Sequence, residues 1–336
     1  MPHTVKISGY LRPLLIGKLK LRNNIFLAPM AGITDGPFRR LAIEGGAGLV
    51  CSEMVSSKAL AHGHKRTHKM LELTAAEHPV SIQIFGPDPE SMAAAAKTAE
   101  QCGADIIDIN FGCPVPKIAK SGAGAVLLSN EKAASAIMES TSKAVRIPVT
   151  AKIRIGRNSG ENIAPRFVNI AEENGISAVI IHGRPAASGH KGAPDLDAIR
   201  KAGEFARIPV IGNGGITNET SALNFFERTD CDGIMIGRGA IGDFGIFARI
   251  EHFLNTGEKL PDSTWETRID NFRKHAELAV ELYGEKRGLI RMRKIVAYYL
   301  KDMPGASSIR NRFCKIESVK EMDGLLSNMR QSPHFD

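Results

Sequence analysis

The chain has 336 residues, enough for one large domain or two ordinary ones, and its 43% hydrophobic and 24% charged residues are typical of a globular protein. Five scattered cysteines without a CxxC pair exclude a disulfide framework and a cysteine zinc site, and they favour a reducing cytoplasm. The N-terminus lacks the layout of a secretory signal and no apolar run could span a membrane, so we expect a cytoplasmic protein without a membrane partner. The net charge of +8 suits either simple solubility or a polyanionic partner such as nucleic acid.

Short β-branched runs alternate with helical patterns from residue 25 to residue 236. The predicted strands are Ile25–Ala28, Leu49–Cys51, Val80–Phe85, Ile106–Ile109, Val149–Ile153, Ala178–Ile181, Val210–Gly212 and Gly233–Ile236. The helical segments between them include Pro89–Cys102, Glu131–Val145, Asn162–Asn174, Leu196–Phe205 and Asn218–Arg228. This alternation predicts parallel strands with right-handed crossovers, and eight units fit an α/β fold of the (β/α)8 TIM-barrel type. An open doubly wound sheet fits the sequence less well, because no Gly-x-Gly-x-x-Gly motif begins a helix after the first strand.

The pattern changes after about Phe247, where strand-like runs stop. Helical periodicity then runs through Trp265–Tyr283, Lys286–Lys301 and Lys315–Arg330. We therefore predict a barrel domain over residues 1–250 and a small all-helical domain over residues 251–336.

Nearly every predicted strand has polar residues or glycines at or near its carboxyl end. They are Pro29-Met30-Ala31, Glu53, Gln83, Asn110 with Cys113, Lys152 with Arg154, His182 with Arg184, Asn213-Gly214-Gly215 and Gly237-Arg238-Gly239. Because the carboxyl ends of barrel strands meet at one face, we expect these residues to line one pocket. The last two sets combine glycines with an arginine at the usual phosphate position of such barrels, which predicts a phosphate site.

Cys113 differs from the other four cysteines, which we interpret as small core residues. It lies between Gly112 and Pro114 just beyond a strand, so its thiol is expected to leave the strand end. A thiolate nucleophile and a neutral thiol acting as general acid are both compatible with this position.

Two basic segments bear on a possible polyanion. On a helix spanning 286–301, Arg287, Arg291, Lys294 and Lys301 fall within roughly 80° of one another, which suits a phosphate backbone or a solvated face. The segment Ala61–Lys69 is rich in histidine and cations but holds no cysteine or carboxylate, so we expect a mobile basic loop and no metal site.

Together these residues carry a family resemblance. The motifs are Ala28-Pro29-Met30-Ala31-Gly32-Ile33-Thr34-Asp35, Ser52-Glu53-Met54, Asp108-Ile109-Asn110-Phe111-Gly112-Cys113-Pro114, Lys152-Ile153-Arg154, His182-Gly183-Arg184, Gly212-Asn213-Gly214-Gly215-Ile216 and Ile236-Gly237-Arg238. In this order they resemble the tRNA-dihydrouridine synthases, most closely the bacterial B-type branch. The resemblance covers almost the whole chain.

The resemblance implies an FMN-binding barrel followed by a helical domain that holds tRNA, in a monomer without a metal. NADPH, or NADH, would reduce FMN, which would give a hydride to C6 of a uridine while Cys113 protonates C5, with Lys152 and His182 as the other catalytic residues. The implied FMN-binding residues are Pro29, Met30, Ala31, Gln83, Asn110, Lys152, His182, Asn213, Gly214, Gly215, Gly237 and Arg238. The implied RNA-binding residues are Arg154, Arg184, Arg287, Arg291, Lys294 and Lys301.

Two other functions fit parts of the sequence. An FMN barrel acting on a free pyrimidine, similar to dihydroorotate dehydrogenase, would need no basic helical domain. An RNA-binding protein without catalytic activity would need no set such as Cys113, Lys152 and His182.

Overall fold

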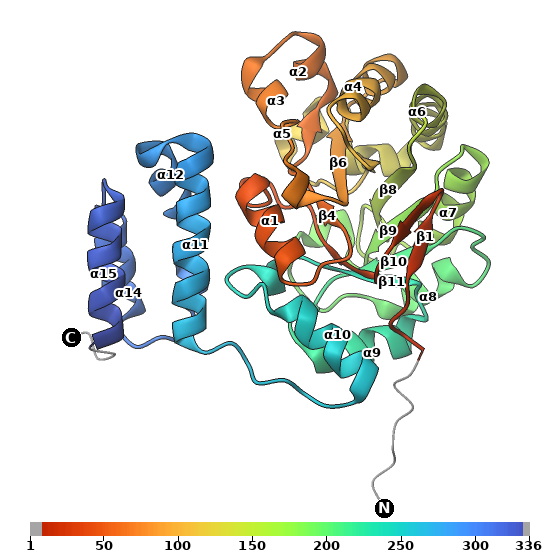
Figure 1. Cartoon of the computed structure of the whole chain (residues 1–336). Helices are drawn as coiled ribbons and strands as arrows, with labels where there is room; N and C mark the ends of the chain where they lie inside the picture. The colour runs from red at the N-terminus through yellow and green to blue at the C-terminus, as the bar shows by residue number, and fades with distance from the viewer. Residues whose placement is uncertain (1–8, 332–336) are drawn as a thin grey trace, which may run out of the picture.

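Eight parallel strands form a closed barrel in the computed structural model, which describes residues 9–331 (Figure 1). They are β3 (Ile25–Leu27), β4 (Val50–Cys51), β6 (Val80–Phe85), β7 (Ile106–Asn110), β8 (Val149–Arg154), β9 (Ala178–His182), β10 (Val210–Asn213) and β11 (Gly233–Ile236). Their order is β3-β11-β10-β9-β8-β7-β6-β4. A parallel bridge between Phe26 and Leu49 joins the two ends of this order and closes the barrel. The TIM barrel and all eight predicted strands are thus confirmed.

Amphipathic helices cover the outside of the barrel. They include α1 (Gly36–Glu44), α4 (Pro89–Gln101), α6 (Glu131–Ala144), α7 (Ala164–Glu173), α8 (Leu196–Gly203), α9 (Glu219–Thr229) and α10 (Ile246–Thr256). Helix α4 illustrates the local reasons: the Asp88 side chain accepts a hydrogen bond from Ser91 N at 2.9 Å, and Pro89 occupies the first turn. Met92, Ala95 and Ala99 then recur at helical spacing and are buried against the sheet.

The sequence patterns missed a short hairpin, β1 (Leu14–Ile16) and β2 (Leu19–Leu21). Leu14, Ile16 and Leu21 are buried in a cluster with apolar side chains of the barrel interior. This hairpin covers the amino-terminal side of the barrel, since a side chain at Gly17 would lie 3.0 Å from Pro148, just before β8. It therefore leaves the carboxyl ends of the strands for a functional site.

The C-terminal part of the chain is helical, with α11 (Trp265–Tyr283), α12 (Glu285–Met292), α13 (Val296–Tyr299), α14 (Ala306–Phe313) and α15 (Val319–Gln331). The predicted bounds of α11 are confirmed. The single helix predicted over residues 286–301 is wrong, because α12 ends at Met292 and a turn separates it from α13. In that turn, Lys294 N and Ile295 N bond to carbonyls three residues back, which winds the chain more tightly than an α-helix and interrupts its hydrogen-bond pattern.

Helix α10 packs on α9 and is followed by a segment without regular structure, residues 257–264. The predicted domain boundary at residue 250 falls inside α10, and we propose the boundary in residues 257–264 instead. Beyond it, α11 packs beside α1 (Figure 1). The His275 ring meets Phe38 of α1 and Phe244 at centroid distances of 5.6 and 6.2 Å.

The basic segment Ala61–Lys69, predicted as a mobile loop, begins at the last residue of the short helix α2 (Ser57–Ala61) and contains a second short helix, α3 (Lys65–Lys69). Among the described residues, no helix is both long and apolar enough to cross a membrane.

Candidate active site

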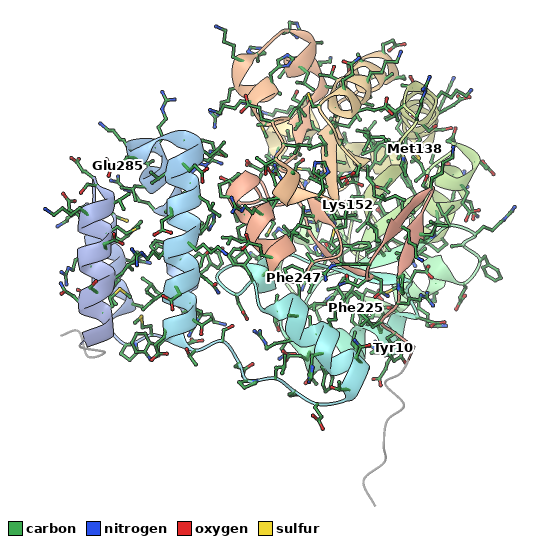
Figure 2. The ribbon with its side chains drawn as sticks, in the orientation of Figure 1. Tyr10, Met138, Lys152, Phe225, Phe247 and Glu285 are labelled. Carbon is green, nitrogen blue, oxygen red and sulfur yellow. The ribbon has the colours of Figure 1, made fainter. Side chains whose placement is uncertain are left out.

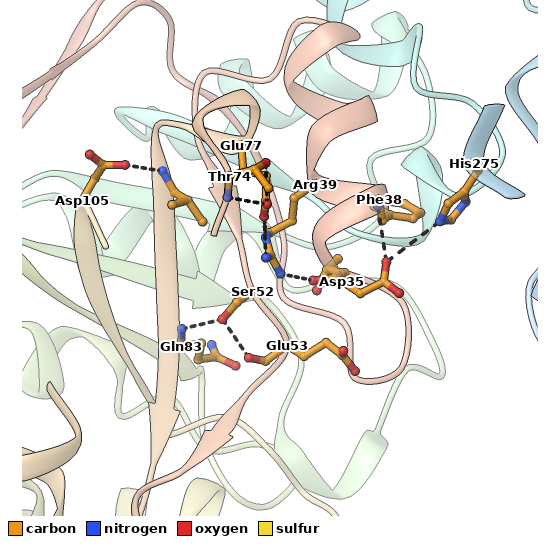
Figure 3. Close-up of polar contacts among 12 residues, drawn as sticks. Asp35, Phe38, Arg39, Ser52, Glu53, Thr74, Glu77, Gln83, Asp105 and His275 are labelled. Carbon is orange, nitrogen blue, oxygen red and sulfur yellow. Dashed lines mark hydrogen bonds and ion pairs between the residues drawn. The ribbon is translucent and has the colours of Figure 1, made fainter. Parts of the chain in front are cut away.

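Polar side chains form a connected network inside the barrel, beneath the carboxyl ends of the strands. Asp108 accepts hydrogen bonds from Gln83 Nε2 and Thr150 Oγ1, both at 2.7 Å. Ser52 Oγ accepts from Gln83 N at 3.0 Å (Figure 3). Burial raises the pKa of Asp108, against the opposing effect of its hydrogen bonds and of the nearby Lys152 ammonium. The network holds Gln83 in one orientation at the base of the site.

Asn110, the last residue of β7, connects this network to the Cys113 loop. Its Nδ2 donates to Gln83 Oε1 at 2.8 Å. Its Oδ1 accepts from Gly112 N at 3.1 Å and from Cys113 N at 2.9 Å. Asn110 therefore fixes the turn from which the half-buried Cys113 side chain projects.

Lys152 lies next to Asn110 in the register of β7 and β8, among the strands of the barrel (Figure 2). Its Nζ donates to Asn213 Oδ1 at 3.0 Å. Burial lowers the pKa of Lys152 to about 8, helped by the Arg154 charge and opposed by Asp108. Lys152 is therefore still mostly protonated at neutral pH, but it binds its proton less tightly than an exposed lysine does.

His182 ends β9 and is held by the same amide residue, since its Nδ1 lies 3.1 Å from Asn213 O and must donate to that carbonyl. Burial, together with the charges of Lys152 and Arg154, lowers the pKa of His182 to about 2, so the imidazole is neutral. Its Nε2 is consequently an acceptor, and it is buried with no hydrogen-bond partner. This atom fits an N–H group of a ring-shaped ligand.

The glycines after β10 leave backbone open beside this imidazole. Gly214 has φ +131° and Gly215 has φ +75°, a region that other residues rarely adopt. A Cβ atom at Gly214 would lie 3.1 Å from His182 Nδ1. On the other side, a Cβ atom at Gly237 would lie 3.8 Å from Met30 Sδ. Met30 and Pro29 are half-buried beyond β3, and Ala31 is exposed.

Three arginines surround this position without a carboxylate partner. None of the ion pairs within residues 9–331 involves Arg154, Arg184 or Arg238. Burial lowers the pKa of Arg184, and the neighbouring Arg238 charge lowers it further. Exposed Arg238 provides a positive charge without a carboxylate partner, and Gly214 and Gly215 provide open backbone. An anion such as a phosphate requires both.

Arg154 is 4% exposed and bonds to backbone rather than facing the outer surface. Its Nε donates to Gly112 O and one terminal nitrogen donates to Gly189 O, each at 2.8 Å. Arg184 is also buried and donates to Gly192 O at 2.9 Å. Arg154 thus lies beside the Cys113 loop, and neither of these two arginines, both predicted to bind RNA, faces the outer surface.

Of the remaining predicted RNA-binding residues, three line one groove and Lys301 does not. A groove of about 550 Å³ between the barrel and α12 is lined by Arg287, Arg291 and Lys294, with Arg66 and Lys69 of α3 opposite. We refer to it as the interdomain groove. Because the predicted continuous helix is broken, Lys301 follows α13, lies 3.9 Å from Asp302 and is not among the residues that line the groove.

Sequence reasoning missed Asp108 and Thr150 of the interior network and His190, whose ring lies 5.8 Å from that of His182. For Asp108 a signal was present: it is a carboxylate inside the apolar run Ile106-Ile107-Asp108-Ile109. His190 lies eight residues beyond β9 in an irregular loop, and no periodicity places such a residue.

A parallel (β/α)8 barrel with amide, ammonium, imidazole and thiol groups gathered at the carboxyl ends of its strands defines a barrel enzyme. The comparison with protein families specifies which kind. Residues 26–333 match the family described as dihydrouridine synthase, and the chain belongs to that family.

Curated relatives agree over most of their length. The "tRNA-dihydrouridine synthase B" of Pseudomonas putida is 40% identical over 321 residues, covering 94% of this chain and 95% of the relative. The "Probable tRNA-dihydrouridine synthase" of Rickettsia bellii is 39% identical over 296 residues, covering 88% and 91%.

Solved structures share the fold at low identity. A morphinone reductase variant has a TM-score of 0.54 at 12% identity and covers 78% of this chain and 94% of its own. Histamine dehydrogenase from Rhizobium sp. 4-9 has a TM-score of 0.59 at 13% identity, with coverages of 82% and 51%. These two support the barrel architecture alone.

Proposed function

We propose that this protein is a cytoplasmic tRNA-dihydrouridine synthase that uses FMN and NADPH to reduce the C5–C6 double bond of uridines in tRNA, and that it acts as a monomer. Family membership and the names of the relatives support the reaction and the tRNA substrate. The residues at the strand ends support the cofactor, because they offer a ring acceptor, open glycine backbone and uncompensated arginines in one place.

The FMN site in this proposal uses the strand-end residues on both sides of His182. Gly214, Gly215, Gly237 and Arg238 would hold the phosphate through backbone N–H groups and the guanidinium. Pro29, Met30, Ala31, Gln83, Asn110, Lys152, His182 and Asn213 would hold the ring and ribityl chain. The bound flavin, reduced by NADPH, supplies the hydride for C6 of the uracil ring.

The single observation that carries the proposal is the double role of Asn110. One carboxamide binds Gln83 in the barrel interior and also fixes the backbone of Cys113. It thereby sets the Cys113 thiol at a constant place beside the strand ends, as a proton donor for C5 requires. Of the two roles left open for Cys113, the acid is the one that we propose.

The remaining catalytic residues prepare the site for a polar ring. Lys152, with its pKa near 8, would place a positive charge beside the flavin ring and stabilise negative charge on it. Neutral His182 would accept a hydrogen bond from an N–H group of the ring. Arg154 and Arg184, which are bonded to backbone carbonyls of the surrounding loops, would enclose the uracil ring and exclude water. A uridine must leave its base stack to reach this depth.

The tRNA backbone would follow the interdomain groove. Arg287 and Lys294 line the groove, and neither takes part in the ion pairs found within residues 9–331. Lys301 is 74% exposed and is a separate basic position for RNA contact.

The test is to map dihydrouridine in tRNA from cells with and without the gene, and then to add purified protein and NADPH to the unmodified tRNA. We expect specific positions to lose dihydrouridine on deletion and to regain it in the reaction, with FMN identified in the protein by chromatography. Unchanged dihydrouridine in the deletion strain contradicts the proposal. Reduction of free uracil or orotate, but not of tRNA, would support the free-pyrimidine alternative, and binding of tRNA without any turnover would support the non-catalytic one.

A further inference from the structure

Arg291 differs from Arg287 and Lys294, which line the interdomain groove beside it, because it is already bound to the barrel. Its Nε donates to Asp35 Oδ2 at 3.0 Å, and its terminal Nη2 lies 3.0 Å from the same oxygen and 3.6 Å from Glu53 Oε2. Its guanidinium also lies over the Tyr283 ring, 4.3 Å from the centroid. Two carboxylates and an aromatic ring thus hold a side chain that is only 32% exposed.

Asp35 joins Arg291 to the start of α1 and to α11. Its side chain is buried, its Oδ1 accepts from Phe38 N at 3.3 Å, and His275 Nε2 lies 4.0 Å away (Figure 3). Burial alone would raise the pKa of Asp35, but His275 and Arg291 outweigh it and the pKa is lowered. One charged carboxylate of the barrel is therefore shared by α11 and α12.

Asp35 also ends the segment 29–35, which begins with the proposed flavin-binding residues Pro29, Met30 and Ala31. Within this segment, Thr34 N donates to Met30 O and Met30 N donates to Thr34 Oγ1, both at 3.0 Å. Glu53, the second carboxylate beside Arg291, accepts a hydrogen bond from Gly32 N. Arg291 is therefore connected to both the end and the middle of a hydrogen-bonded turn.

We propose that Arg291 is a positioning residue, which fixes α12 and the interdomain groove against the segment 29–35 and does not bind an RNA phosphate. The inference rests on the proposed function for its substrate, and it revises the role predicted for Arg291 from the sequence. A phosphate contact would require Arg291 to give up its two carboxylates, whereas Arg287 and Lys294 in the same groove have none to give up.

Removing the charge of Asp35 distinguishes a positioning role of Arg291 from phosphate binding, because the two roles predict opposite changes in tRNA affinity. Asparagine caps a helix about as well as aspartate, so Asp35→Asn keeps the Phe38 contact and removes the charge beside Arg291. If Arg291 positions α12, this variant of the holoenzyme should raise the KM for tRNA about fivefold with a smaller change in kcat. If Arg291 binds phosphate, the same variant should instead tighten tRNA binding, because it frees the guanidinium.

The decisive set adds Arg291→Gln and the double variant. Positioning predicts that Arg291→Gln and Asp35→Asn have similar effects, that the double variant is no worse than either, and that the dependence of tRNA affinity on salt is unchanged. Arg291→Lys should restore only part of the activity, because it loses the planar fork. Tighter binding by Asp35→Asn, or a salt slope reduced by about one in Arg291→Gln, would overturn the proposal.

Matched controls exist on the same elements. Arg287→Gln is the positive control for a lost phosphate contact and should reduce the salt slope by about one. Lys286→Gln makes the same charge change on α12 outside the groove, and Asp88→Asn makes the same change at the cap of α4.

Hydrogen exchange without tRNA keeps this inference distinguishable from the proposed function. In the holoenzyme, both Asp35→Asn and Arg291→Gln should speed amide exchange in α12 and in residues 29–35, whether or not tRNA is the substrate. Unchanged exchange in either segment would refute the coupling even if the enzyme reduces tRNA.

Discussion

Lys152→Met tests whether the buried ammonium at the centre of the site is maintained at a cost in stability. The pKa of Lys152 is lowered from 10.5 to about 8, chiefly by burial. Each pKa unit corresponds to about 1.4 kcal/mol, so the protonated side chain lowers the free energy of unfolding by about 3 kcal/mol near neutral pH. Methionine removes this cost but also the hydrogen bond to Asn213 Oδ1, worth about 1 to 2 kcal/mol. We therefore expect Lys152→Met to be more stable than the natural protein by about 1 to 2 kcal/mol at pH 7, while losing most of its turnover.

The pH dependence gives the sharper test, because the hydrogen-bond contribution cancels. The native state binds the Lys152 proton less tightly than the unfolded chain does. The cost is therefore complete below pH 8 and disappears as the pH rises from about 8 towards 10.5. Between pH 7 and 9.5 the natural protein should recover about 2 kcal/mol relative to Lys152→Met.

The assay is urea unfolding of flavin-stripped protein, followed by far-ultraviolet circular dichroism at both pH values. Lys18→Met, at an exposed position in the β1–β2 turn, corrects for the general effect of removing a lysine. A stability difference between Lys152→Met and the natural protein that is the same at pH 7 and pH 9.5 would refute the assignment of a lowered pKa.

Three further predictions concern other parts of the site and the fold. Cys113→Ala should keep its flavin, seen by absorbance, but lose most turnover on tRNA; unchanged turnover would reject the acid role. Gly214→Ala should lower the ratio of flavin to protein after purification, because its Cβ meets the neighbouring imidazole, whereas Gly103→Ala, equally restricted in φ but with open space around it, should not. Arg39→Met should reduce the free energy of unfolding by about 3 to 5 kcal/mol, because it leaves a buried carboxylate without its partner. The exposed neighbour Arg40→Met should cost under about 1 kcal/mol, and equal losses in urea unfolding would contradict this explanation.

The barrel could be predicted from sequence because its information is local. A buried parallel strand needs a short apolar, β-branched run and its covering helix needs a 3.6-residue period, and both are visible within a dozen residues. Polar residues near the carboxyl ends of such runs, such as Gln83 and Lys152, have no packing reason to be there, so the pattern also predicted where the candidate site lies. The β1–β2 hairpin escaped because its alternating runs are only three residues each.

The sequence by itself determined the fold class, the strand ends and the family motifs of this protein, since each depends on residues close together in the chain. Only the tertiary structure decided what several charged residues do. Arg291 carries a basic pattern locally, yet its partner Asp35 is 256 residues away. In the sequence Arg154 resembles a surface cation, but in the structure it is buried and donates hydrogen bonds to the carbonyls of Gly112 and Gly189. Helical periodicity continues through residues 286–301, but the chain turns between α12 and α13, and Lys301 is not among the residues that line the groove. Charge and periodicity are local properties, whereas the partner of a charge is fixed only when distant segments pack together.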